Sequence, residues 1–139
     1  MKVILIMGLP GSGKTTLAAN LSHSLGANWF NADEIRTRFS DWDFSIEGRL
    51  RQARRMRDLC DLSNTDYAIA DFVAPLVEQR EIISPDYLIW VDTIKHSKYP
   101  DTDKLFVPPV NYNFRVTEQD ARKWADLITK QILNETKTH

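Results

Sequence analysis

Short apolar runs alternate with helically spaced apolar positions along this chain. Five runs, mostly apolar and β-branched or aromatic, are predicted as strands: residues 2–7, 27–31, 66–71, 87–91 and 112–116. Between and after them, apolar residues recur at the spacing of a helix face, which predicts further elements: residues 15–25, 32–39, 46–62, 76–83 and from about 117 to 133. Near-continuous apolar runs are typical of strands that are buried on both sides of a parallel sheet.

The segment between the first predicted strand and helix carries the strongest motif. It reads Gly8-Leu9-Pro10-Gly11-Ser12-Gly13-Lys14-Thr15 and fits G-x-x-x-x-G-K-[ST], the phosphate-binding loop (P-loop). Its glycines allow successive N–H groups to point at phosphate oxygens, and the following helix N-terminus adds partial positive charge. Lys14 is expected to reach the β- and γ-phosphates, and the Thr15 hydroxyl to help hold Mg²⁺. Residues 8–16, ending at Thr16, are the predicted site for ATP with Mg²⁺.

The order of the predicted elements determines the expected fold. Strands that alternate with helices form parallel sheets with right-handed crossovers. We therefore expect an α/β fold of three layers, the P-loop NTPase fold, with a five-stranded parallel sheet and helices on both faces. Ligands of such sheets bind at the carboxyl ends of the strands. This rule brings the P-loop, Asp33, Asp71 and the segment after the fourth strand into one cleft.

Composition narrows the class of protein without identifying its ligand. A length of 139 residues suits one domain over 1–139, and a net charge of −1 gives no overall attraction to nucleic acid or an anionic membrane. The single cysteine, Cys60, excludes an internal disulfide and suits a reducing compartment. We find no apolar run long enough for a bilayer and no signal peptide, so a cytoplasmic protein is expected. The polar tail 134–139 is expected to fray.

Two acidic residues follow predicted strands and could take part in chemistry. Asp33 opens a helix, with Arg36 one turn later; a helix N-terminal carboxylate beside an exposed arginine is the simpler interpretation. In the functional interpretation, Asp33 orients a substrate hydroxyl or accepts its proton, and Arg36 binds an anionic group of the substrate. Asp71 ends an apolar strand and could bind a magnesium-ligating water, act as base or cap the next turn. Which of the two aspartates is the base stays open.

The helix predicted over 46–62 places one arginine among apolar residues. Arg49 shares a stripe with Ile46, Ala53, Met56 and Cys60. An inward guanidinium needs an anion, either a buried carboxylate or a phosphate or sulfate of the acceptor. Gln52 follows Arg49 by three residues, so it lies beside Arg49 on the helix surface and could hydrogen-bond the same ligand. The remaining arginines near it are interpreted as a solvated face: Arg51, Arg54 and Arg55.

Residues 93–109 contain three prolines and little periodicity, and are predicted to form a loop or lid. Small P-loop kinases usually close a lid that brings an arginine onto the transferring phosphoryl group, but residues 81–114 contain none. The lid lysines are Lys95, Lys98 and Lys104, and we take Lys98 as the catalytic cation. Phe44 and Phe106 could sandwich a planar base, or anchor their loops.

Several segments together resemble the adenylylsulfate kinase family. They are residues 8–16, Asn31-Ala32-Asp33-Glu34-Ile35-Arg36, Phe44-Ser45-Ile46-Glu47-Gly48-Arg49 with residues 50–55, and Ala70-Asp71-Phe72-Val73-Ala74-Pro75 with Arg80. This family transfers the γ-phosphoryl group of ATP to the 3′-hydroxyl of adenylylsulfate. The resemblance implies that Asp33 assists that hydroxyl and that Arg36 and Arg49 contact the phosphosulfate. It also places Phe44, Gln52 and Phe72 in the substrate site, with Gln52 where the family tends to have an asparagine.

The resemblance covers roughly the first 80 residues and ends there. The lid sequence differs from the family's pattern, and Asn31 replaces the first acidic residue of its Asp-Gly-Asp-Asn motif. We expect an ATP- and Mg²⁺-dependent kinase of a small hydroxyl acceptor, with adenylylsulfate as first choice. The alternatives are another acceptor (a nucleoside, a sugar or a hydroxymethylated base in DNA) or a nucleotide-binding module without catalysis. Nucleic acid is not the favoured partner, no membrane partner is expected, and a homodimer stays open.

Overall fold

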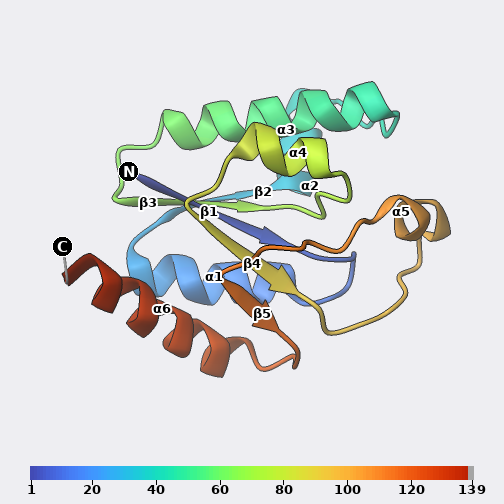
Figure 1. The fold of residues 1–139 in the computed structure, drawn as a ribbon. Helices are drawn as coiled ribbons and strands as arrows, with labels where there is room; N and C mark the ends of the chain where they lie inside the picture. The colour runs from blue at the N-terminus through green and yellow to red at the C-terminus, as the bar shows by residue number, and fades with distance from the viewer. Residues whose placement is uncertain (138–139) are drawn as a thin grey trace.

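The structure is a computed structural model that describes residues 1–137 (Figure 1). Its elements in chain order are β1 (Lys2–Met7), α1 (Lys14–Leu25), β2 (Asn28–Asn31), α2 (Ala32–Phe39), α3 (Ile46–Asp61), β3 (Tyr67–Asp71), α4 (Val77–Ile83), β4 (Tyr87–Val91), α5 (Pro100–Leu105), β5 (Phe114–Val116) and α6 (Ala121–Lys137). The strands form one parallel sheet in the order β2-β3-β1-β4-β5. The predicted α/β fold is confirmed.

Helices cover both faces of the sheet, as Figure 1 shows. On one face, Leu17 and Leu21 of α1 and Ile128 of α6 pack against the β-branched residues of the strands. On the other face, Met56 and Cys60 of α3 pack with α2 and α4 residues against the alternate strand positions. Burial raises the pKa of the Cys60 thiol to about 12, so this cysteine is unreactive at neutral pH. None of the described helices is both long and apolar enough to cross a lipid bilayer.

Strand register brings the ends of three strands into line. Asp71, the last residue of β3, pairs with Ile6 of β1 on one side and with Asn31 of β2 on the other. The segments that follow these strands therefore start from adjacent points at one edge of the sheet. This is the edge at which the sequence predicts the ligand site.

One predicted boundary at the C-terminal end is wrong. The last helix begins at Ala121 rather than after Thr117, and the carboxylate of Asp120 accepts a hydrogen bond from the Lys123 N–H at 3.4 Å. Asp120 is therefore the residue that caps this helix, because an Asp side chain can satisfy one of the free N–H groups of a first turn. Residues 134–137 of the polar tail belong to α6, residues 138 and 139 lie outside the described ones, and the expected fraying stays a prediction.

The predicted lid contains a helix that sequence periodicity missed. Helix α5 has six residues, too few to display a helical repeat of apolar positions. It begins with a proline, which suits the first position of a helix, and its Asp103 carboxylate accepts hydrogen bonds from the Ser97 N–H and hydroxyl at 2.9 and 2.5 Å. The segment from 93 to 109 is thus a loop folded around one short helix.

The loop before α3 approaches Gly48, in the first turn of this helix, so closely that a larger residue does not fit there. A Cβ at this position would overlap the carbonyl oxygen of Asp43. In an open helix, Gly→Ala stabilises by roughly 1 kcal/mol. Because of the overlap, we expect Gly48→Ala to reduce the free energy of unfolding by about 1–3 kcal/mol in urea titrations. The exposed Asp58→Ala change on the same helix is the control, and equal stability of both variants would contradict the packing argument.

Candidate functional site

The P-loop connects β1 to α1 with backbone that suits an anion. Gly11 and Gly13 have φ values of 81° and 102°, in the left-handed region that favours glycine. Gly13 occupies the N-cap of α1, where no side chain accepts a hydrogen bond from the first turn. The Ser12 hydroxyl oxygen is buried and has no hydrogen-bond partner among the described residues. An uncapped helix N-terminus with a buried, unpartnered hydroxyl fits a phosphate ligand.

Lys14 brings a buried positive charge to this loop. Only 8% of the residue is exposed, and its Nζ donates to the Leu9 carbonyl oxygen at 3.2 Å. Burial lowers the pKa of Lys14, and the negative charges of Asp71 and Asp33 act in the opposite direction. The ammonium group therefore lies within electrostatic reach of both carboxylates that sequence analysis singled out.

Residues after β4 and β5 hold the outer side of the P-loop. The Thr93 hydroxyl donates to the Ser12 carbonyl oxygen at 2.6 Å, and the Gln119 amide donates to the same oxygen at 3.3 Å. Anchored carbonyl groups limit how far the peptide N–H groups of the loop can turn. Sequence analysis missed both residues, although each follows a strand at its carboxyl end, which is the available signal.

A cavity of about 180 Å³ lies beside the P-loop, between α1 and the beginning of α6. Its walls include apolar side chains of Leu17, Val91 and Val116, and its polar lining includes Thr16 and Gln119. Apolar walls with a few polar groups suit a flat heterocycle or a ribose. Thr16, predicted at the nucleotide site, thus lines a cavity that is continuous with the P-loop.

The carboxylate of Asp71 accepts hydrogen bonds from three donors on two elements, α1 and β2. Its Oδ2 accepts hydrogen bonds from Thr15 Oγ1 at 3.2 Å, from Trp29 Nε1 at 3.2 Å and from Asn31 Nδ2 at 2.9 Å. Burial raises the pKa of Asp71, while these hydrogen bonds and the nearby Lys14 charge counteract the shift. Sequence analysis found Thr15 and Asp71 but missed Trp29 and Asn31; their alternate positions on one strand were the signal.

The pairing of Thr15 with Asp71 fits a magnesium ion. Hydroxyl and carboxylate oxygens are ligands that Mg²⁺ prefers, and Mg²⁺ usually keeps several waters besides one or two protein groups and phosphate oxygens. Within residues 1–137, no group of three or more His, Cys, Asp or Glu side chains is arranged to hold a metal by itself. A metal at this position would therefore depend on a bound phosphate.

Asp33 is exposed at the beginning of α2, two residues after Asn31, which pairs with Asp71 across the sheet. Burial lowers the pKa of Lys14 and of Arg36, and the negative charge of Asp33 is a small opposing contribution in both cases. An exposed carboxylate at this edge of the sheet is accessible to a ligand. This placement separates Asp33 from Asp71, whose side chain is almost completely buried.

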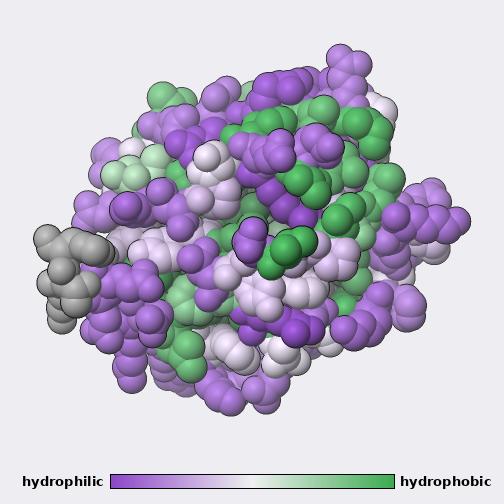
Figure 2. Space-filling view, viewed as in Figure 1, coloured by the Kyte–Doolittle hydropathy of each residue, from purple (hydrophilic) through white to green (hydrophobic). Residues whose placement is uncertain are grey.

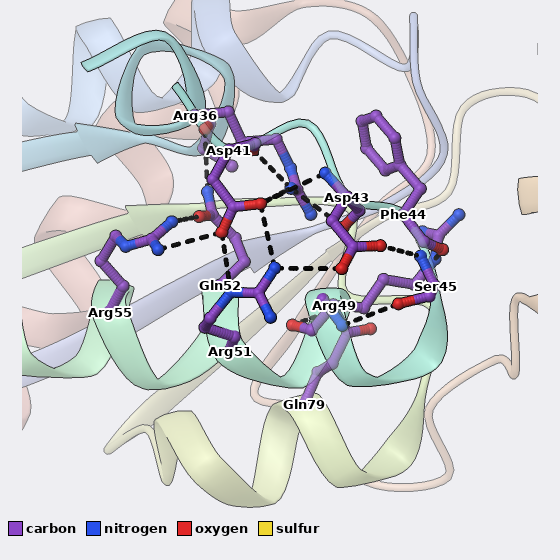
Figure 3. A network of polar contacts seen from close by, with 12 residues as sticks. Arg36, Asp41, Asp43, Phe44, Ser45, Arg49, Arg51, Gln52, Arg55 and Gln79 are labelled. Carbon is purple, nitrogen blue, oxygen red and sulfur yellow. Dashed lines mark hydrogen bonds and ion pairs between the residues drawn. The ribbon is translucent and has the colours of Figure 1, made fainter. Parts of the chain in front are cut away.

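Arg36 and Arg49 come from different helices and approach the same aromatic ring (Figure 3). Their guanidinium carbons lie 4.2 and 5.4 Å from the centre of the Phe44 ring. Arg36 donates to the carbonyl oxygens of Asp41 and Asp43 at 2.8 and 3.2 Å, and Arg49 to that of Phe44 at 2.9 Å. Among the described residues, no carboxylate forms an ion pair with Arg49. Of the two predicted interpretations of Arg49, the buried carboxylate partner is wrong.

The guanidinium groups of Arg36 and Arg49 belong to residues that are largely buried. Burial lowers the pKa of Arg49, and it lowers that of Arg36 together with the nearby Arg49 and Arg55 charges, against the Asp41 carboxylate. The loop between α2 and α3 and the residues beside it expose several apolar side chains to about half: Phe39, Trp42, Phe44 and Ile46. Figure 2 shows hydrophobic side chains gathered over α4 and the beginning of α3, whereas the α6 side is mainly hydrophilic. The pair and its surroundings can accept an anion attached to an apolar or planar group.

Asp41 forms ion pairs with two of the arginines that were predicted to be solvated, Arg51 and Arg55. Its carboxylate accepts hydrogen bonds from Arg51 Nε at 2.8 Å and from Arg55 at 3.0 Å, and Arg51 also reaches Asp43 at 3.1 Å. The hydrogen bonds from Arg51 and Arg55 hold the pKa of Asp41 well below its usual range. The predicted solvated face is right for the exposed Arg54 and for Arg51, whose side chain is 40% exposed although it is ion-paired. It is wrong for Arg55, whose side chain is 17% exposed.

Three residues assigned to the inner site or stripe lie elsewhere. The Gln52 amide is fully buried and used internally, because Nε2 donates to the Ala32 carbonyl and Oε1 accepts from Arg55. Phe72 is 5% exposed and packs in the core beneath α3 and α4. Both side chains are engaged within the protein, and their contact with a substrate stays a prediction. Ile46, placed on the apolar stripe of its helix, is 51% exposed because it begins α3 beyond the edge of the sheet.

The lid approaches the acceptor side of the site through one contact. Arg49 donates to the Thr102 hydroxyl of α5 at 3.3 Å. Of the three lid lysines, Lys95 forms an ion pair with Asp92 at 3.6 Å, while Lys98 is exposed and makes no ion pair within the described chain. Lys98 as a catalytic cation stays a prediction.

The base of the lid is anchored by Arg80, as a structural role predicts. Its guanidinium donates to the carbonyl oxygens of Ala74, Pro75 and Val107. Burial lowers the pKa of Arg80 to about 10. Phe106 lies 5.6 Å from this guanidinium carbon and packs against the core, which favours its role as a loop anchor.

Comparison with known proteins agrees with this architecture. The family model described as an AAA domain matches residues 3–94, more than half of the chain. No curated protein matches the sequence significantly. Among solved structures, the APS kinase CysC of Mycobacterium tuberculosis in complex with AMPPNP and APS has a TM-score of 0.76 at 19% identity, covering 94% of this chain and 96% of that one.

Kinases with other acceptors have similar folds. Shikimate kinase from Acinetobacter baumannii in complex with shikimate has a TM-score of 0.67 at 18% identity and covers 97% of this chain and 94% of that one. A gluconokinase from Sinorhizobium meliloti has a TM-score of 0.60 at 12% identity, with coverage of 96% and 97%. At these identities the likeness establishes a shared fold, and the acceptor must be argued from the residues of this chain.

Proposed function

The chain belongs to the AAA domain family, and from this premise we propose that it is a P-loop kinase that phosphorylates a hydroxyl group of a small anionic acceptor. The observation that carries the proposal is that an exposed carboxylate, Asp33, begins α2 at the same edge of the sheet as the P-loop, one turn before the buried Arg36. The buried Lys14 belongs to the phosphate-binding loop at that edge. A carboxylate placed there can orient a hydroxyl toward a phosphoryl group.

The donor is ATP with Mg²⁺ in this proposal. The P-loop and Lys14 bind the phosphates, and the cavity beside Thr16 and Leu17 receives the nucleoside. Thr15 and Asp71 would hold Mg²⁺, which supplies charge neutralisation on the β- and γ-phosphate oxygens. The M. tuberculosis kinase of similar fold was solved in complex with AMPPNP, which supports a nucleotide as ligand.

The acceptor is adenylylsulfate in the finer form of the proposal. Arg36 and Arg49 offer two guanidinium groups to the phosphosulfate, and the half-exposed Phe44 ring between them can stack on a purine. The same order of Asp33, Arg36 and Arg49 appears in the resemblance noted from sequence, and the M. tuberculosis APS kinase was solved with APS. The activity would belong to sulfate assimilation.

The two aspartates receive different roles. Asp71 has one oxygen engaged by three donors and is nearly enclosed, so we assign it to the metal. Asp33 is exposed to the cleft and is assigned to the acceptor hydroxyl. The exposed Lys98 is retained as the lid cation that would complete the site when α5 moves over the nucleotide.

ATP consumption by the purified protein with a panel of acceptors tests this function. With Mg²⁺ present, we expect turnover to depend on adenylylsulfate and to be lower with shikimate, gluconate and nucleosides. Turnover with another acceptor would show that adenylylsulfate is the wrong acceptor, while the assignment as a kinase would hold. No turnover with any of them, by a folded protein that binds ATP, would leave only the nucleotide-binding module.

Asp33→Asn separates a kinase from a nucleotide-binding module. Because the amide cannot accept a proton as a carboxylate does, we expect kcat to fall by about 100- to 1000-fold. The dissociation constant for ATP should change less than threefold or so, since Asp33 belongs to the acceptor side. Steady-state kinetics measures kcat, and isothermal titration calorimetry measures the dissociation constant for ATP. A comparable Glu34→Gln change at the next exposed position is the control, and equal kcat in both variants would contradict the assigned role.

A kinase of another anionic hydroxyl compound is the second candidate. Two guanidinium groups bind a carboxylate or a phosphate as well as a sulfate, and the shikimate kinase fold covers almost the whole chain. A DNA acceptor is less favoured, because Arg51 and Arg55 are ion-paired with Asp41 and are not free for backbone phosphates.

A further inference from the structure

Trp29 lies on β2, two residues before Asn31, so both side chains leave the strand on the same face. Its partner across the sheet is Ile69 of β3, and the partner of Asn31 is Asp71. The Trp29 side chain therefore lies on the same face of the sheet as the Asp71 side chain, at a position that corresponds to two residues before Asp71. Its Nε1–H donates to Asp71 Oδ2 at 3.2 Å.

The hydrogen bonds around Asp71 are distributed unevenly between its two oxygens. Oδ2 accepts from Thr15, Trp29 and Asn31, which belong to α1 and β2. No donor reaches Oδ1 within the described residues. Three donors on one oxygen fix the plane of the carboxylate, and the other oxygen keeps its lone pairs for a ligand outside the protein.

We propose that Trp29 is a positioning residue that aims Asp71 Oδ1 at the water shell of the nucleotide-bound Mg²⁺. This inference rests on the proposed function only for the presence of Mg²⁺ with a nucleotide. It does not depend on the acceptor. An indole donates one hydrogen bond and accepts none, so its contact with Asp71 keeps a single direction.

Trp29 is a more specific probe of this arrangement than Asn31. The Asn31 amide also reaches Thr15 Oγ1 at 3.3 Å, and its oxygen accepts from the Glu34 N–H at the beginning of α2. Replacing Asn31 would thus disturb the helix cap as well as the carboxylate. The Trp29 indole N–H has one acceptor, and Trp29→Phe removes that hydrogen bond while retaining an aromatic ring.

The chain offers a matched control in Trp124. Its indole nitrogen is buried and has no partner among the described residues, so Trp124→Phe removes a donor that bonds to nothing. The protein has four tryptophans, and their indole N–H groups give separate proton–nitrogen NMR signals that the two variants assign. Titrating Mg²⁺ into the ADP-bound wild-type protein should move the Trp29 signal and leave that of Trp124 in place. Asp71→Asn should also move the Trp29 signal.

Metal affinity provides the second readout. Groups that orient a metal-binding side chain typically change affinity by 10- to 100-fold, and we expect Trp29→Phe to raise the half-saturating Mg²⁺ concentration for ADP binding by about tenfold. Trp124→Phe should change it less than about twofold. The inference would be overturned if neither Mg²⁺ nor Asp71→Asn changed the position of the Trp29 signal. Equal Mg²⁺ requirements of Trp29→Phe and Trp124→Phe would also overturn it.

These outcomes are separable from the proposed function. A protein that shows the Trp29 response to Mg²⁺·ADP but phosphorylates no acceptor supports the inference and overturns the kinase proposal. An active kinase whose Mg²⁺ requirement is unchanged in Trp29→Phe overturns the inference alone. The wild-type titration measures the response in the unaltered protein, and the variants serve there only to assign the two signals.

Discussion

Lys14→Ala is expected to reduce acceptor-dependent ATP consumption by about 1000-fold, the largest effect of any single change in this chain. Lys14 is buried, and its ammonium donates to the Leu9 carbonyl within the P-loop. A buried cation in a site with little water stabilises developing phosphate charge far more than an exposed one does. Alanine suits a helix, and the change removes the ammonium group together with its aliphatic stem and its hydrogen bond to Leu9.

Steady-state kinetics and thermal unfolding together measure this effect. We expect the melting temperature of the free Lys14→Ala protein to stay close to that of the wild type, because removing a buried charge relieves its desolvation. The rise in melting temperature on adding ATP and Mg²⁺ should be largely lost. Lys130→Ala, at an exposed position of α6, should leave both quantities unchanged. A Lys14→Ala enzyme with wild-type turnover would remove the basis for a P-loop nucleotide site.

Arg49→Met is expected to raise the KM for the acceptor by about 100-fold and to leave the KM for ATP unchanged. Arg49 is 7% exposed and donates to the Phe44 carbonyl and the Thr102 hydroxyl, with no carboxylate partner among the described residues. Methionine fills a similar volume without charge, so the change isolates the guanidinium. The effect should fall on the acceptor because Arg49 lies with Arg36 around Phe44, away from the P-loop.

Arg54→Met on the same helix is the matched control. Arg54 is exposed, and its loss should affect neither KM. Because the Arg49 guanidinium is buried and its pKa is lowered by desolvation, we expect Arg49→Met to unfold at the same temperature as the wild type or higher. If Arg49→Met raised the KM for ATP as much as that for the acceptor, the separation into donor and acceptor halves would be wrong.

Local sequence patterns were sufficient to predict the sheet and its order of elements. The apolar runs over Lys2–Met7 and Tyr87–Val91 are strands, and the glycine-rich motif between a strand and a helix is the P-loop. Helix α5 escaped prediction, because its six residues are too few to show a helical period. Strand β5 was predicted but begins two residues later than expected, at Phe114. The start of α6 was misplaced because Thr117 and Asp120 are both good capping residues, and only backbone geometry distinguishes them.

The partners of the charged residues could not be predicted in the same way. Helical spacing placed Arg49 inward and Arg54 outward, as the structure has them. It also assigned Arg51 and Arg55 to solvent, because nothing local indicates that the loop before α3 returns Asp41 to them. The same limit applies to Gln52, whose amide is taken up by the Ala32 carbonyl of a neighbouring helix.

The sequence by itself determined the fold class, the phosphate-binding loop and the edge of the sheet at which Asp33 and Asp71 lie. These follow from periodicity and from short motifs, which act over neighbouring residues. Only the tertiary structure decided which groups meet across that edge: Trp29 and Asn31 with Asp71, Arg36 and Arg49 with Phe44, and Asp41 with the outer arginines. Contacts between distant segments depend on strand register and on the path of loops, and no local pattern encodes either.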